Sequence, residues 1–179
     1  MSKHDTLNEI ENIENITNKK VKYKKNASNE ERKVINSSFI EYSYTEQLEM
    51  INKLYLGCND ASSNLSICIK REINRKISGY KHQDIKNEIY NEKELINMED
   101  VLEKLVASKL KCLYCKCSVN IIYKCVREET QWTLDRIDND LCHSSSNTII
   151  SCLKCNLKRR NINKEKFLFT KSLRIKKIE

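Results

Sequence analysis

The sequence predicts an α+β protein in which α-helices come first and a small unit with strands follows. Only two glycines and no proline occur in 179 residues, which leaves too few turn residues for an all-β sandwich. Between positions 44 and 110 the apolar residues recur at helical spacing. From Lys111 onward cysteines, β-branched residues and aromatic residues replace that spacing, which indicates strands. Hydrophobic residues make up 39% of the chain, enough for one modest core.

The first part of the chain, residues 1–38, is polar and contains few large apolar side chains. Five lysines cluster between positions 19 and 25. Because such a composition buries too little apolar surface to offset the entropy lost on ordering, we expect a flexible arm here. The helical region is then expected over residues 39–110 and the mixed unit over residues 111–179.

Four helices are expected in the helical region. Apolar stripes over positions 48–54 and 67–77 predict the first two, and Gly79 is expected to end the second. Positions 82–90 predict a third, short helix. Asn97 is expected to cap the fourth, whose apolar residues share one face.

The mixed unit is expected to contain three strands and a basic helical tail. Runs rich in β-branched and aromatic residues predict strands over 119–126, 132–137 and 148–152. After Cys155 the pattern becomes helical. Residues 156–179 contain nine Lys or Arg and two Glu, a net charge of +7 out of +8 for the whole chain. Such a tail suits a polyanion partner, although a solvated tail that only aids solubility has the same composition.

Four of the nine cysteines form two Cys-x-x-Cys pairs, at Cys112 and Cys115 and at Cys152 and Cys155. Two such turns can complete a tetrahedral Zn²⁺ site, so we expect a structural zinc ion. Buried free thiols are the alternative. Cys117 is a possible spare ligand. The other four are interpreted as small buried hydrophobic residues: Cys58, Cys68, Cys125 and Cys142.

The odd number of cysteines and their metal-ligand spacing do not favour a secreted disulfide framework. The chain opens without an apolar signal-peptide core and contains no apolar run long enough for a membrane span. We therefore expect a soluble intracellular protein with no membrane partner.

A polar stretch lies between the two cysteine pairs. Asp135, Asp138, Asn139 and Asp140 place four carboxylate or carboxamide groups within six residues. Oxygen ligands of this kind suit a hard divalent cation. A polar hairpin turn would use the same residue types, since Asp and Asn favour turns.

The order LDRIDN…H…N…CLKCN…KRR resembles the zinc-containing branch of the HNH, or His-Me finger, endonucleases. It is especially similar to HNH-like proteins of large DNA viruses, over about 50 residues. The resemblance implies a zinc-stabilised ββα-metal unit held by the two Cys-x-x-Cys pairs. It also implies a location in the host cytoplasm or nucleus, or in the virion, if the protein is viral.

The resemblance also implies roles for particular residues. Asp135 matches the metal-binding carboxylate, Asn147 the loop residue that fixes the hairpin, and Asn156 the helix residue that completes a Mg²⁺ or Mn²⁺ site. Arg136 stands where the family has its general-base histidine. A guanidinium cannot accept a proton at neutral pH, so His143 is the leading substitute.

His143 has an alternative role, because it can also pack in the turn and shape it by hydrogen bonding. Asp138 is a second candidate for base or metal ligand. Arg136 itself can hold a phosphate with its planar fork. If the protein is an active nuclease, the basic residues after Cys155 are expected to bind the nucleic-acid backbone: Lys158, Arg159, Arg160, Lys164 and Lys166.

The first functional hypothesis is therefore a metal-dependent endonuclease that hydrolyses phosphodiester bonds in DNA. The second is a catalytically inactive zinc module that binds DNA or RNA. A third, a protein-interaction module, would not require the basic tail. DNA is preferred to RNA as the partner, and the oligomeric state does not follow from the sequence.

Overall fold

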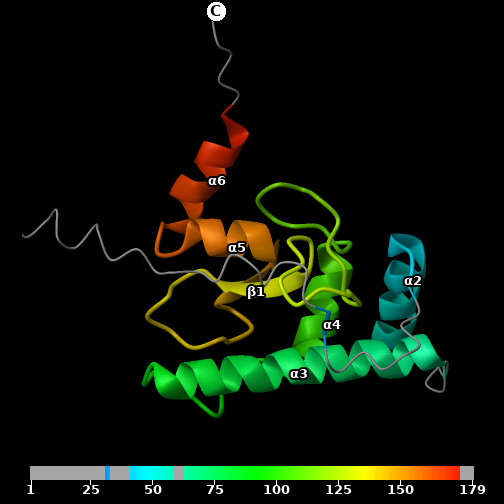
Figure 1. Cartoon of the computed structure of the whole chain (residues 1–179). Helices are drawn as coiled ribbons and strands as arrows, with labels where there is room; N and C mark the ends of the chain where they lie inside the picture. Colours follow the sequence, from blue (N-terminus) through cyan, green and yellow to red (C-terminus); the bar gives the residue numbers. More distant parts are fainter. Residues whose placement is uncertain (1–30, 33–40, 59–62, 174–179) are drawn as a thin grey trace, which may run out of the picture.

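The computed structural model describes residues 31–32, 41–58 and 63–173 (Figure 1). It confirms an α+β fold, with five helices and one two-stranded sheet among these residues. Most of the predicted arm lies outside the described residues. Its described residues, Glu31 and Arg32, lie against the rest of the chain: the Arg32 backbone N–H donates to the Lys124 carbonyl, and its guanidinium pairs with Glu72.

The helical region consists of α2 (Tyr44–Tyr55), α3 (Asn64–Lys86) and α4 (Met98–Ala107). Figure 1 shows α3 as a long helix along one side of the molecule, and α2 and α4 both contact it and each other. The predicted cap of α4 is confirmed, since the Asn97 side chain accepts from the Asp100 N–H at 2.9 Å.

The prediction that Gly79 ends the second helix is wrong, because α3 continues to Lys86. Glycine costs a helix only about 1 kcal/mol relative to alanine. Burial of Ile69 and Ile73 against the core outweighs so small a cost. The predicted third helix is thus the last turn of α3, and the chain turns at Glu88, which has a positive φ of 60°.

The two strands β1 (Trp132–Arg136) and β2 (Thr148–Cys152) form an antiparallel hairpin, as predicted. Trp132 pairs with Cys152, and Arg136 with Thr148. The helix α5 (Leu153–Arg159) follows β2 directly, so these elements have the order ββα. The last helix, α6 (Lys164–Ser172), projects from α5 away from the helical region (Figure 1).

The predicted strand over 119–126 is wrong. Val119 and Ile121 are buried as a strand pattern would require, but they do not join a sheet. The Ile121 and Ile122 N–H groups donate instead to the Gln47 side-chain oxygen, at 2.8 and 3.0 Å. The buried Gln47 of α2 thus satisfies two N–H groups of a segment whose other pairing, among the described residues, is limited to isolated bridges of Asn120 with Gln131 and of Cys125 with Glu31.

One core joins the helical region to the ββα unit. Val101 and Leu105 of α4 belong to the same buried cluster as Trp132 and Leu134 of β1. The hairpin is therefore supported by helices from elsewhere in the chain, as a two-stranded sheet requires. Among the described residues, no helix combines the length and apolar character that crossing a bilayer needs.

Candidate metal centre and polar pocket

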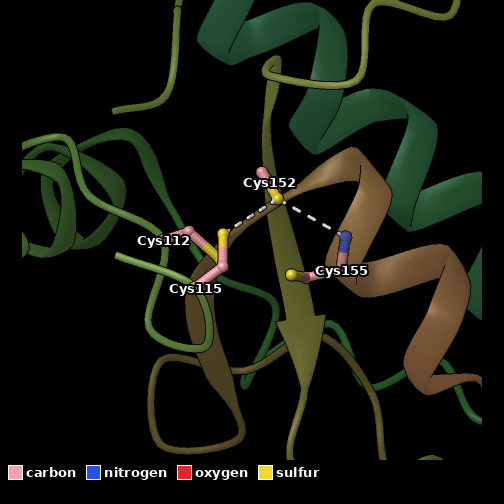
Figure 2. Close-up of side chains that lie close together, drawn as sticks. All are labelled: Cys112, Cys115, Cys152 and Cys155. Atoms are coloured by element: carbon pink, nitrogen blue, oxygen red, sulfur yellow. Dashed lines mark hydrogen bonds between the residues drawn. The ribbon is translucent and has the colours of Figure 1, made fainter. Parts of the chain in front are cut away.

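The two cysteine pairs meet at the junction of β2 and α5 (Figure 2). Cys152 ends β2 and Cys155 lies in the first turn of α5, while the turn at 112–115 brings the other pair alongside. All four Sγ atoms lie within 4.8 Å of one another. Zn–S bonds of about 2.3 Å in a tetrahedron place sulfurs about 3.8 Å apart, and the Cys115 and Cys152 Sγ atoms are 3.8 Å apart. The four cysteines can therefore hold one metal ion such as zinc.

The protein alone does not stabilise four thiolates at this site. A hydrogen bond from Cys152 lowers the pKa of Cys112 to about 4. Burial, followed by the charge of Cys112, raises the pKa of Cys155 to about 12. One thiolate thus opposes ionisation of its neighbours, and a bound divalent cation would reverse that effect. The donor set fits a metal.

The remaining cysteines differ from one another in burial. Cys117 lies beside the four, with its Sγ 3.2 Å from that of Cys115. Cys142 is buried as predicted. Cys58 is exposed, and Cys68 and Cys125 are only partly buried, so the prediction that they are buried hydrophobic residues is wrong for Cys58.

A polar pocket of about 830 Å³ lies between the hairpin loop, the α5–α6 loop and α3. It is lined by Asp135, His143 and Asn156, three of the four residues that the sequence placed at a catalytic site. Arg136 and Arg160 line it as well. Most of these residues come from one hairpin and the helix after it, which explains why a local motif could find them.

Asp135 is buried and its carboxylate is already hydrogen-bonded. Arg159 donates from Nε to Oδ2 at 2.8 Å and from Nη2 to Oδ1 at 2.9 Å, and the Tyr114 hydroxyl donates to Oδ2 at 2.7 Å. Arg159 is only 1% exposed, and its Nη1 donates to the Ile162 carbonyl. It therefore lies inside the molecule, which differs from the expected position on a nucleic-acid-binding surface.

His143 is buried and oriented by a residue of α3. Its Nδ1 lies 2.7 Å from Asp84 Oδ1, its backbone N–H donates to Asp84 Oδ2 at 2.8 Å, and its ring stacks on Tyr80. Burial lowers the pKa of His143 below 6.5, so the ring is neutral at pH 7. If Nδ1 carries the proton donated to Asp84, Nε2 keeps a lone pair and can act as a base.

Asp84 is a site residue that the sequence analysis missed. It is fully buried, and the Arg136 guanidinium lies 3.7 Å from its Oδ1. The available signal was the position of Tyr80 and Asp84 four residues apart, which places both on one face of α3. That spacing says nothing of a partner 59 residues later in the chain.

The two asparagines have different surroundings. Asn147 is buried and bridges the hairpin loop, donating to the Asp138 and Cys142 carbonyls and accepting from the Asp138 N–H. It thus shapes the loop, as the resemblance implied, and does not line the pocket. Asn156 donates to Thr133 Oγ1 at 3.1 Å, and its side chain lines the pocket beside Asp135.

The other expected phosphate contacts lie at or near the surface. Lys158, Arg160 and Lys166 are exposed, and Lys164 is paired with Glu165 at 3.3 Å. Arg136 is partly buried and donates to the Leu141 carbonyl.

No family model, curated protein or solved structure matches this chain. The resemblance to HNH nucleases therefore depends on the residues and spacing given above.

Proposed function

We propose that this protein is a metal-dependent endonuclease that hydrolyses phosphodiester bonds in DNA, with its active site in the polar pocket. The observation that carries this proposal is the joint placement of Asp135, Asn156 and a neutral His143 oriented by Asp84. A base held by a carboxylate, next to oxygen ligands for a cation, is the arrangement that water activation requires.

Each of these residues has a distinct role in the proposed reaction. His143 Nε2 accepts the proton of the attacking water, and Asp84 stabilises the imidazolium that forms. A carboxylate has about four accepting positions, and the hydrogen bonds from Arg159 and Tyr114 to Asp135 use three, which leaves one on Oδ1. That position and the Asn156 amide oxygen would hold Mg²⁺ or Mn²⁺, which supplies charge stabilisation to the leaving oxygen. Arg136 and Arg160 would bind the phosphate.

We further propose that zinc occupies the cysteine cluster and has a structural role, because four thiolates form a closed site with no open position. The ββα order and the basic α5 and α6 support placement of the unit in the HNH class.

The test is nicking of supercoiled plasmid by zinc-loaded protein with Mg²⁺, with Mn²⁺ and with neither. Omission of the divalent ion is preferable to a chelator, because a chelator would also strip the cysteine site. Wild type is compared with Asn156→Ala and His143→Gln, and Asn74→Ala is the matched control because Asn74 is exposed on α3 and lies outside the pocket. Ion-dependent nicking lost in the two pocket variants and kept in the control supports the proposal. Absence of ion-dependent nicking in the wild type contradicts it.

A second candidate is a module that binds nucleic acid without cutting it. The bidentate pair of Arg159 with Asp135 favours it, since a guanidinium beside the carboxylate opposes a second cation there. In that case wild type retards DNA in a gel with or without Mg²⁺, and binding weakens steeply with salt while no strand is cut.

A further inference from the structure

A second, cationic pocket lies along α3 beside the polar pocket. It has a volume of about 710 Å³. Arg75, Lys76 and Lys86 of α3 line it together with Arg32 from the N-terminal segment. We call it the α3 pocket. None of the catalytic, metal-binding or nucleic-acid-binding residues expected from the sequence lines it.

The positive charge of the α3 pocket exceeds the negative charge that balances it. Glu72 pairs with Arg32 at 2.6 Å and with Arg75 at 3.0 Å, so one carboxylate serves two guanidiniums. Lys76 and Lys86 add further amines to the lining. No Asp or Glu side chain lines the pocket among the residues described. The lining is therefore suited to an anion.

The cations are held in place by aromatic side chains and hydrogen bonds. Both Arg32, whose Cζ is 4.4 Å from the Tyr123 ring centroid, and Lys76, whose Nζ is 5.3 Å from it, make cation–π contacts with this ring. The Tyr123 hydroxyl accepts from Arg75 Nη2 at 2.6 Å. Lys76 Nζ donates to Gln131 Oε1 at 3.2 Å. Because these side chains are held by neighbours, an anion would meet charges that are already oriented.

The lowered pKa of Lys76 is consistent with an anion site. Burial, followed by the charge of Arg75, lowers the pKa of Lys76 to about 7. A phosphate bound beside Lys76 would raise this pKa again. The lysine would then carry a full positive charge and pair with the phosphate.

The α3 pocket adjoins the polar pocket. Tyr80 and Gln83 line both, and the Tyr80 hydroxyl accepts from the Leu134 N–H of β1 at 2.9 Å. From Arg75 to Lys86 the helix rises about 16 Å, at about 1.5 Å per residue. Roughly five nucleotides of a duplex strand rise the same distance, at about 3.4 Å each.

We propose that the α3 pocket binds backbone phosphates of a nucleic-acid strand whose next phosphates enter the polar pocket. This inference rests on the proposed function only in that the polar pocket takes part of the same strand. The α3 region, which the sequence left without a role, would then position the strand on the ββα unit.

The experiment measures binding of a fluorescent 12-nucleotide DNA by anisotropy, without added Mg²⁺ or Mn²⁺, as a function of salt. Wild type is compared with Lys86→Gln and Arg75→Gln. The matched controls are Lys70→Gln and Arg71→Gln, which remove the same charges from exposed positions of α3 that do not line the pocket. Thermal unfolding of each variant confirms that it folds.

We expect each pocket variant to weaken binding about five-fold and to lower the salt slope by about 0.7, the value for one lost single-strand phosphate contact. Each control should change affinity less than two-fold. Equal effects in pocket and control variants would overturn the inference. If inorganic phosphate competes as well as the oligonucleotide per phosphate, the pocket holds a small anion and not a strand. Binding without any nicking would contradict the nuclease but leave this inference standing.

Discussion

The cysteine cluster and the polar pocket lie at opposite ends of the β1–β2–α5 unit, and their polar atoms are satisfied in different ways. The four Sγ atoms of the cluster chiefly face one another. In the pocket, by contrast, Asp135 is bound by Arg159 and Tyr114, and His143 by Asp84. The cysteine cluster requires a bound metal ion to be stable when its thiols are ionised. The charged groups of the polar pocket are already paired with protein groups.

This difference suggests separate roles for the two sites: stability of the fold for the cysteine cluster, and the proposed chemistry for the polar pocket. Four clustered thiolates contribute stability only when a metal is bound, so a metal ion there would act as a structural cross-link. A pocket whose charges are paired by protein groups can keep its shape without an ion. We therefore expect that loss of metal disrupts the cysteine end of the unit and that loss of a protein partner disrupts the pocket.

The largest effect is expected from Cys155→Ser. Structural zinc contributes about 10 kcal/mol or more of apparent free energy in zinc-finger peptides, so loss of one ligand should release the metal and unfold the ββα unit. Metal content by mass spectrometry and thermal unfolding by circular dichroism measure both. The control is Cys58→Ser, since Cys58 is exposed and outside the cluster. Full metal retention by Cys155→Ser would refute the structural role of a metal held by these four cysteines.

The next effect is expected from Arg159→Ala, which leaves the buried Asp135 carboxylate without its guanidinium. Removing one partner of a buried ion pair costs about 3–5 kcal/mol. Urea unfolding of zinc-loaded protein measures it, with the exposed neighbour Arg160→Ala as the control, for which a change under about 0.5 kcal/mol is expected. Similar losses of unfolding free energy in both variants would mean that the Arg159–Asp135 pair does not stabilise the pocket.

Acid should destabilise the protein through His143. Its folded pKa is below the value of 6.5 that we take for the unfolded chain, because burial disfavours the charged ring. Below pH 6.5 the unfolded chain therefore binds more protons, and the stability present at higher pH is lost as the pH falls through this window. One proton limits the slope to about 1.4 kcal/mol per pH unit. Unfolding at several pH values should show a smaller slope for His143→Gln than for His82→Gln.

The smallest effect, and one of opposite sign, is expected from Gly79→Ala in the helix that carries Tyr80 and Asp84 to the pocket. A Cβ at Gly79 meets no atom within 4 Å, so the helix should gain about 0.5–1 kcal/mol. Gly57→Ala is the contrasting variant, because Gly57 has a φ of +69° that a side chain strains. Destabilisation by Gly79→Ala would show that α3 is not a regular helix at this point.

Much of the fold was predictable because its signals are local. The cap at Asn97, the hairpin strands and the loop-bridging Asn147 each depend on residues fewer than ten positions apart or on a local run of β-branched and aromatic residues. The failures are equally informative. The run at 119–126 has a strand composition, but Gln47, more than 70 positions earlier, supplies the hydrogen-bond partner that makes a strand unnecessary.

The sequence by itself determined the two Cys-x-x-Cys pairs and the set of polar residues that the hairpin carries, since short spacing keeps the members of each set together. Only the tertiary structure decided what those residues do. The packing of α3 against the hairpin brings Asp84 to His143, and the return of α5 buries Arg159 against Asp135. Both contacts join distant segments, and their stability comes from the exclusion of water by the shared core, which no local pattern encodes.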